Sequence, residues 1–146
     1  MFQQVSVAST AMLAPVIALV LWTFVMWAWM YWTRIPAILG SKMRLDPNLP
    51  RGQQMNELPA NVRWKADNYN HLFEQPTLFY AVALTLALLR DQSGLAVGLA
   101  WAYVVLRVVH SVWQATVNVI HIRFYLFAAS SVVLFALTLK AAARVF

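Results

Sequence analysis

Four ionisable residues lie within or at the ends of stretches apolar enough to cross a membrane: Glu74, Arg107, His110 and Arg123. An arginine at the centre of a bilayer costs about 2.5 to 3.5 kcal/mol on insertion scales, so a charged residue there indicates a functional site. In a site partly shielded from water, an arginine stabilises an anion and a carboxylate holds an amine or a neighbouring cation. These four residues are therefore the first candidates for chemistry.

A stripe of polar side chains continues this pattern along the third apolar stretch. Its members recur every three to four residues, which puts them on one face of a helix. Lipid cannot satisfy guanidinium or amide groups, so the stripe is expected to face other helices or a water-filled cavity. The members are Tyr103, Arg107, His110, Ser111, Gln114, Asn118 and His121.

Two other interpretations fit the same residues. In a purely structural one, Glu74 and Arg107 form an interhelical ion pair, and such polar contacts average only about 0.6 kcal/mol. In the other, His71 and His110 are the axial ligands of a haem, although one histidine per helix carries no spacing information. His71 and His121 are otherwise expected to lie at the membrane interface without a chemical role. No metal site is predicted.

Composition places these residues in an integral membrane protein. The chain has 146 residues, of which 62% are hydrophobic and 11% charged, whereas soluble domains have about 25% charged residues. The net charge of +6 comes from basic residues in loops and at helix ends, so nucleic acid is not an expected partner. The chain contains no cysteine, which excludes disulfides, thiolate metal sites and a cysteine nucleophile.

The expected fold class is an all-α integral membrane protein with one domain, residues 1–146, and four transmembrane helices. The spans are expected at about 8–33, 68–89, 94–118 and 123–143. The first apolar run is far longer than a signal-peptide core, so we interpret it as an uncleaved span. Loop 34–67 holds six of the eleven basic residues, so the positive-inside rule predicts that it is cytoplasmic.

Two segments resemble the MAPEG family, the membrane-associated proteins in eicosanoid and glutathione metabolism. They are KADNYNHLFEQPTLFY, residues 65–80, and RVVHSVWQATVNVIHIR, residues 107–123. Four helices, a long basic loop after the first and an arginine opening the fourth complete the likeness over nearly the whole chain. The resemblance implies a homotrimeric four-helix bundle that binds glutathione between subunits.

The resemblance also implies roles for particular residues. In that family a polar series at the start of the second helix binds glutathione, and an arginine at the start of the fourth helix stabilises its thiolate. Arg123 matches the thiolate-stabilising arginine and is the expected catalytic residue. Glu74 and Pro76 match a glutamate and a proline of the polar series. Either Asn70 or Asn68 matches its asparagine, and Asn70 is the candidate contact.

Further matches extend the expected glutathione site. Arg107 and His110 match an arginine and histidine pair on the third helix of the prostaglandin-synthase-like members. Gln114 stands where those members carry a tyrosine that contacts glutathione. Arg63 and Lys65 stand where the family has arginines that bind the carboxylates of the tripeptide.

The expected activity is a glutathione transferase or peroxidase reaction on a lipophilic electrophile that partitions from the lipid bilayer. A free thiol with a pKa of about 8.5 is only a few per cent ionised at neutral pH, and the thiolate is the nucleophile. Lowering that pKa by two units requires about 2.7 kcal/mol, which a well-placed arginine can supply. The alternatives are a non-catalytic scaffold of the same fold and a haem-binding or transport protein. The membrane is either a bacterial inner membrane or an internal eukaryotic one.

Overall fold

The computed structural model describes residues 10–50, 52–91 and 93–146, and all regular structure within these ranges is helical. The helices are α2 (Leu13–Ser41), the short 3-10 helix η1 (Gln54–Glu57), α3 (Ala60–His71), α4 (Gln75–Leu88), α5 (Gly94–Thr116) and α6 (Ile120–Val145). The predicted all-α class is confirmed. Residues 8 and 9 of the predicted first span, Arg51 of the basic loop and Gln92 of the second turn lie outside the described residues.

Helix α2 continues beyond the predicted end of the first span. It passes through Pro36 and ends at Ser41, where Lys42 adopts a left-handed conformation with φ 52°. Pro36 removes one backbone N–H donor, and helices in membranes tolerate that loss when neighbouring groups satisfy the freed carbonyl. The first part of the predicted loop 34–67 is therefore helical, and its last part is α3.

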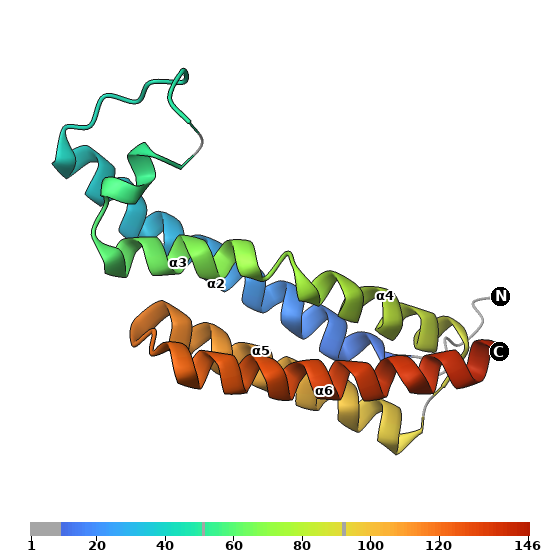
Figure 1. Ribbon diagram of the computed structural model, residues 1–146. Helices are drawn as coiled ribbons and strands as arrows, with labels where there is room; N and C mark the ends of the chain where they lie inside the picture. Colours follow the sequence, from blue (N-terminus) through green and yellow to red (C-terminus); the bar gives the residue numbers. More distant parts are fainter. Residues whose placement is uncertain (1–9, 51, 92) are drawn as a thin grey trace, which may run out of the picture.

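The predicted second span consists of two helices, α3 and α4, separated at Leu72–Glu74. Pro76 causes the break, because its ring would clash with the carbonyl of residue 72 in a continuous helix. Within α4 the same proline lies in the first turn, where a missing N–H does no harm. Both α3 and α4 lie alongside α2 and pack on it (Figure 1).

Three helices in the described ranges are long and apolar enough to cross a membrane: α2, α5 and α6. Helix α4 has 14 residues, fewer than the roughly 20 that span a bilayer. The start of α2, the turn between α4 and α5 and the end of α6 lie at one end of the bundle, which we call the terminal end (Figure 1). The 42–59 segment and the turn between α5 and α6 lie at the opposite end, the loop end.

The interior of the bundle is divided along its length. An apolar core fills the terminal end, with Leu19, Phe79, Ala100 and Leu137 fully buried. Phe79 stacks on Tyr103 at 4.6 Å between ring centroids. The buried polar residues of α3 and α5 begin where this core stops and continue toward the loop end. The bundle therefore has a closely packed apolar half at the terminal end and a half with buried polar residues toward the loop end.

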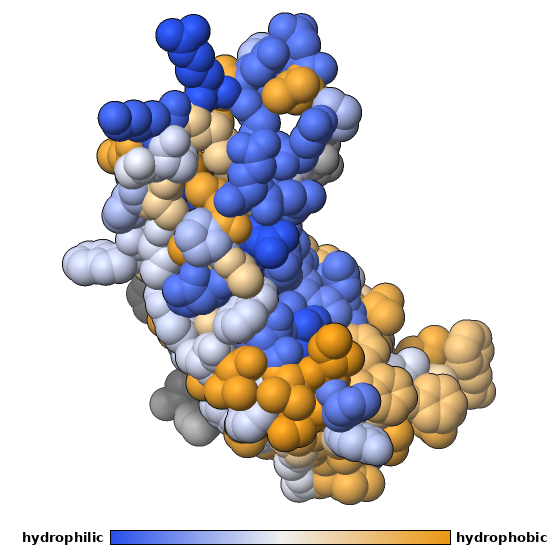
Figure 2. All heavy atoms as spheres, turned by 60° about the vertical axis from the view of Figure 1, so that its left-hand side comes forward, coloured by the Kyte–Doolittle hydropathy of each residue, from blue (hydrophilic) through white to orange (hydrophobic). Residues whose placement is uncertain are grey.

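The outer surface follows the same division. In Figure 2, which brings the loop end forward, hydrophilic side chains cover the upper part of the face, on the side of the 42–59 segment. The lower part, on the side of the turn between α5 and α6, is largely hydrophobic. Large apolar side chains such as Phe24, Trp32 and Phe135 are exposed along the helices, as expected for a surface covered by lipid or by other subunits.

The turn between α4 and α5 is fastened to the end of α6 by Asp91. This carboxylate is 2% exposed and forms ion pairs of 3.3 Å with Lys140 and with Arg144. It also accepts hydrogen bonds from the backbone N–H and the hydroxyl of Ser93 at 3.0 and 2.7 Å. These two hydrogen bonds, which have the largest effect, and Lys140 together lower the pKa of Asp91 to about 2. The Ser93 hydroxyl in turn caps α5 by accepting from Ala96 N–H.

Candidate functional site

The polar stripe of α5 faces the interior of the bundle, as predicted. Its five members within the helix are all buried: Tyr103, Arg107, His110, Ser111 and Gln114. The predicted extension to Asn118 and His121 is wrong, because α5 ends at Thr116. Asn118 adopts a left-handed conformation with φ 57° and donates its N–H to the carbonyl of Trp113 at 2.8 Å. Asparagine tolerates this conformation and thereby terminates the helix.

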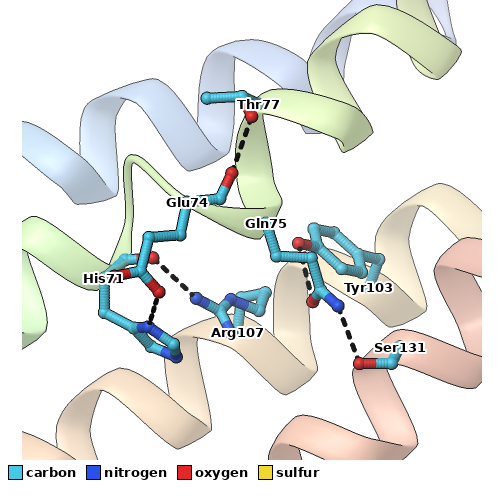
Figure 3. Close-up of polar contacts among 7 residues, drawn as sticks. All are labelled: His71, Glu74, Gln75, Thr77, Tyr103, Arg107 and Ser131. Atoms are coloured by element: carbon cyan, nitrogen blue, oxygen red, sulfur yellow. Dashed lines mark hydrogen bonds and ion pairs between the residues drawn. The ribbon is translucent and has the colours of Figure 1, made fainter.

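Arg107 is buried between α3, α5 and α6 and is only 1% exposed. Its Nη2 donates to the carbonyl of His71 at 3.3 Å (Figure 3). That carbonyl is available because α3 ends at His71 and the last carbonyls of a helix have no donor within it. The guanidinium carbon also lies 5.7 Å from the centroid of the Phe127 ring. Arg107 Nε and Nη1 find no hydrogen-bond partner in the described part of the chain.

Glu74 pairs with His71 instead of Arg107, so the predicted interhelical ion pair is wrong. Its Oε2 lies 2.5 Å from His71 Nδ1 (Figure 3). The break at Leu72–Glu74 explains the difference, since Glu74 has left the helical path and its side chain is 66% exposed. One histidine thus connects the two charges: its ring contacts Glu74 and its carbonyl contacts Arg107.

The two histidines of the haem hypothesis pack on each other. The His71 and His110 ring centroids are 5.3 Å apart, and the His71 ring also lies 5.4 Å from Phe127. Axial imidazoles must face each other across the whole porphyrin plane, whereas these rings leave no gap for one. Among residues 10–50, 52–91 and 93–146, no three His, Cys, Asp or Glu side chains cluster as metal ligands would.

A cavity of about 350 Å³ lies beside this cluster, and we call it the polar cavity. It is lined by His71, His110, Ile120, Arg123, Phe124 and Phe127. Arg123, in the first turn of α6, donates from Nη1 to Asn118 Oδ1 at 2.7 Å. Arg123 Nε and His110 Nδ1 are buried without a hydrogen-bond partner among the residues that the structure describes. The polar cavity therefore has aromatic walls, and residues that line it carry buried nitrogen atoms without a hydrogen-bond partner in the described residues.

The two candidate asparagines lie on different sides of α3. Asn68 is 1% exposed, and its Nδ2 donates to Ser111 Oγ at 2.5 Å. Asn70 is exposed. Gln114 is 3% exposed, and its Oε1 has no partner within the described ranges. Asn68 and Gln114 thus belong to the bundle interior, whereas a ligand would reach Asn70 from outside a single chain.

The two basic candidate residues at the start of α3, Lys65 and Arg63, also lie in different surroundings. Lys65 is 8% exposed, and its Nζ donates to the carbonyls of Asn61 and Ala115 at 2.8 and 3.2 Å. Burial lowers the pKa of Lys65, and its contact with Ala115 satisfies a carbonyl at the C-terminal end of α5. Arg63 instead lines a pocket of about 40 Å³ beside Arg34. Within one chain, these two side chains do not meet at a common ligand.

Sequence reasoning missed Phe127 as part of the site, and it paired His71 with His110 only in the haem interpretation. His71 was expected to be interfacial, yet it contacts Glu74, Arg107 and His110. Its signal was the spacing to Pro76, which ends α3 near residue 72 and frees the carbonyl that Arg107 uses. Phe127 had no signal, because one aromatic side chain on an apolar helix resembles its neighbours.

These elements define an integral membrane protein with a helical bundle and a polar cavity near one end. The family model of the MAPEG family matches residues 12–143. The chain therefore belongs to the MAPEG family, and the resemblance of residues 65–80 and 107–123 is confirmed at that level. No curated protein and no solved structure matches the chain.

Proposed function

We propose that this protein is a membrane-bound, glutathione-dependent transferase or peroxidase that acts on a lipophilic electrophile and uses Arg123 to stabilise the glutathione thiolate. The observation that carries the proposal is the position of Arg123. Its side chain is anchored by Asn118 at 2.7 Å, and Arg123 lines an aromatic-walled cavity. MAPEG membership supports the use of glutathione.

Nitrogen atoms of residues at the polar cavity, and of Arg107 beside it, suit an anionic, polar tripeptide. Arg107 Nε and Nη1, Arg123 Nε and His110 Nδ1 are all without a partner in the described residues. A buried polar group left unpaired costs about 1 to 3 kcal/mol, so a ligand that engages these atoms recovers that free energy. The cavity volume of about 350 Å³ also lies within the range of small-molecule sites, which begins near 300 Å³.

In this proposal Arg123 lowers the pKa of the bound thiol, because a cation beside a thiolate favours the charged form. His71 accepts the thiol proton. Its Nδ1 donates to Glu74, which leaves Nε2 unprotonated in the neutral ring and available as a base. The thiolate sulfur then bonds to an electrophilic carbon that has entered from the lipid, and a carbon–carbon double bond or the bond to a leaving group takes up the electron pair. With a peroxide, sulfur bonds to one oxygen, the O–O bond breaks, and the alkoxide that leaves takes the proton from His71.

The remaining candidates bind the rest of the tripeptide. Arg107, His110 and Gln114 contact it from the bundle interior. Asn70 and Glu74 are exposed on the single chain, which fits a glutathione bound at a subunit boundary of a homotrimer. Arg63 and Lys65 bind its carboxylates, and because they diverge on α3, they serve different carboxylates or different subunits.

The proposal includes a membrane orientation. Residues 68–89, the end of α3 together with α4, are the second crossing, and the 34–67 segment and the turn between α5 and α6 face the cytoplasm, because the first of these segments is rich in Lys and Arg. The polar cavity lies at the same loop end, where water-soluble glutathione is available.

A non-catalytic scaffold is the second candidate, and specific contacts favour it. Asn68 bonds to Ser111 and Arg107 bonds to the carbonyl of His71, and both contacts join α3 to α5. If these polar residues only hold helices together, the protein has no need of glutathione.

Calorimetry with glutathione on the purified protein separates the two candidates. The transferase proposal expects saturable binding at or below millimolar concentration. S-methylglutathione, which cannot form a thiolate, serves as the matched ligand and should bind more weakly to the native protein. It should bind equally well to native protein and to Arg123→Ala. No binding of glutathione up to several millimolar would refute the transferase and leave the scaffold.

A further inference from the structure

Three basic residues gather at the terminal end of the bundle, and we call them the terminal basic cluster: Arg90, Lys140 and Arg144. Arg90 lies in the turn between α4 and α5, and the other two lie in the last two turns of α6. This turn and the end of α6 lie at the same end of the molecule (Figure 1). Asp91 is the one acidic side chain that the structure describes there, so two positive charges are in excess. The proposed thiolate chemistry uses none of these residues.

Asp91 brings two of the cations together. Lys140 Nζ and Arg144 Nε both lie 3.3 Å from Asp91 Oδ2, so the two nitrogens are at most twice that distance apart. An ammonium has three donors and a guanidinium has five. Within the described ranges neither side chain forms another hydrogen bond or ion pair, and Arg144 is 55% exposed. Their remaining donors are therefore open to a second anion.

Two other features add positive potential at the same place. The Arg90 side chain is exposed, and it forms no hydrogen bond or ion pair with any residue that the structure describes. Helix α5 begins here at Gly94, and the first N–H groups of a helix have no acceptor within it and carry a partial positive charge. The side chain of Ser93 satisfies one of them, Ala96 N–H. An anion bound to the terminal basic cluster is stabilised by both features.

The terminal basic cluster lies at the depth of lipid headgroups. From Arg123 to Lys140, α6 rises by about 26 Å at about 1.5 Å per residue, which is close to the roughly 30 Å hydrocarbon core of a bilayer. With Arg123 at one edge of that core, Lys140 lies at the other edge, beside the lipid phosphates. Leu89 and Leu95 are exposed on the two sides of the turn between α4 and α5, and they suit the acyl chains below such a phosphate.

The charge at this end also runs against the general distribution of charge in membrane proteins. In the proposed orientation the terminal end faces away from the cytoplasm, where the positive-inside rule disfavours Lys and Arg. Asp91 balances only one of the three cations. A lipid headgroup with a net negative charge would balance the others, whereas a zwitterionic headgroup brings no net charge.

We propose that the terminal basic cluster binds the phosphate of an anionic phospholipid, with Lys140 and Arg144 as the main donors and Arg90 beside them. The bound lipid joins the turn between α4 and α5 to the end of α6, and it thereby stabilises the bundle at this end. Free inorganic phosphate has the same chemistry, but the position at the membrane edge favours a lipid as its source. The site does not depend on glutathione or on turnover.

Native mass spectrometry of the whole protein, titrated with phosphatidylglycerol or with phosphatidylcholine, measures the selectivity directly. We expect phosphatidylglycerol to bind at least tenfold more tightly, and millimolar inorganic phosphate to leave its binding unchanged. Equal affinity for the two lipids would overturn the proposal. Displacement of phosphatidylglycerol by millimolar phosphate would indicate a site for the free ion and would overturn the assignment to a lipid.

Two double variants test the location of the site. Arg90→Gln with Arg144→Gln removes two cations and keeps the ion pair of Lys140. Lys42→Gln with Arg44→Gln removes the same charge from exposed positions at the loop end and is the matched control. We expect the first double variant to bind phosphatidylglycerol at least tenfold more weakly, and the second to bind it within twofold of the native protein. Equal losses in the two would reveal a nonspecific effect of net charge and would overturn the proposal.

Hydrogen exchange locates the lipid on the native protein without any substitution. The protein is placed in phosphatidylcholine nanodiscs with and without phosphatidylglycerol, and exchange is followed by mass spectrometry. We expect the anionic lipid to slow exchange at least threefold in the turn between α4 and α5 and at the end of α6, and to leave the 42–59 segment unchanged. Protection confined to the 42–59 segment, or protection at neither end, would overturn the proposal.

Discussion

Arg123 and Asn118 are joined across the turn between α5 and α6 by a hydrogen bond of 2.7 Å from Nη1 to Oδ1. Asn118 has a second role, because its left-handed backbone ends α5 and starts the reversal into α6. The residue that shapes the turn therefore also orients the guanidinium. This contact places a cation at the polar cavity.

Asn118→Gly should reduce glutathione turnover without unfolding the protein. Glycine adopts the left-handed backbone without strain, so only the amide that holds Arg123 is lost. A hydrogen bond to a charged group contributes about 1.5 to 3 kcal/mol, and we expect kcat to fall roughly 10- to 100-fold. Asn118→Asp, which keeps an acceptor for Arg123, is the matched control in steady-state kinetics. Equal activity of the glycine variant and the native protein would show that Asn118 does not position Arg123.

Arg107→Met should separate ligand binding from folding. Arg107 has no ion-pair partner among the described residues, so an apolar side chain of similar size leaves no opposite charge buried and unpaired. Two of its nitrogens also lack hydrogen-bond partners there. We therefore expect the melting temperature to stay within a few degrees, whereas the Kd for glutathione rises at least tenfold. A large fall in melting temperature with unchanged Kd would instead assign Arg107 to the scaffold.

Glu74→Ala should impair catalysis more than stability. The Glu74 side chain is 66% exposed, and exposed ion pairs contribute about 0 to 1 kcal/mol, so the melting temperature should change little. Loss of the carboxylate frees the His71 ring, and we expect kcat to fall while KM for the electrophile is unchanged. Glu74→Gln retains an acceptor for His71 Nδ1 and should keep more activity. An Ala variant as active as the Gln variant would remove His71 from the proton transfer.

Asp91 should make stability depend on acid pH. Its folded-state pKa of about 2 lies below the ordinary value of 3.8, so the carboxylate stabilises the fold fully above about pH 4. That contribution is lost as pH falls from about 4 through 2. We expect the melting temperature to drop more between pH 5 and pH 2.5 in the native protein than in Asp91→Asn. Glu57→Gln, at an exposed carboxylate, should retain the native drop; identical drops in all three proteins would contradict the assignment.

Much of the fold could be predicted, because apolar runs of helical length have few alternatives in a membrane. The all-α class and the buried face of α5 followed from hydropathy and periodicity. The continuation of α2 through Pro36 could not be predicted. A proline in the sequence does not reveal whether neighbouring groups satisfy the carbonyl that it leaves without a donor. Pro76 carried the opposite signal, because its ring clashes with the carbonyl of residue 72 in a continuous helix. The span at 68–89 was nevertheless predicted to be unbroken, so the break between α3 and α4 was missed.

The residue types of the site could be predicted from the sequence, but the hydrogen-bond and ion-pair partners of these residues could not. Arg107, His110 and Arg123 stood out because charge in apolar sequence is costly. The partner of Arg107 could not be predicted, since it is the backbone carbonyl of His71 and every residue has a carbonyl. Glu74 was expected to face Arg107, and only the backbone at the break turns it outward to His71 instead.

The most direct test of the central claim is the ultraviolet absorbance of the glutathione thiolate bound to native protein and to Arg123→Ala, followed from about pH 5 to pH 9. Arg123→Lys is the control that keeps a positive charge. The account predicts that the native protein binds thiolate well below the usual pKa of a free thiol, that the lysine variant does so less strongly, and that the alanine variant binds glutathione as thiol. A thiolate signal of the same size and pH midpoint in the alanine variant would contradict the account.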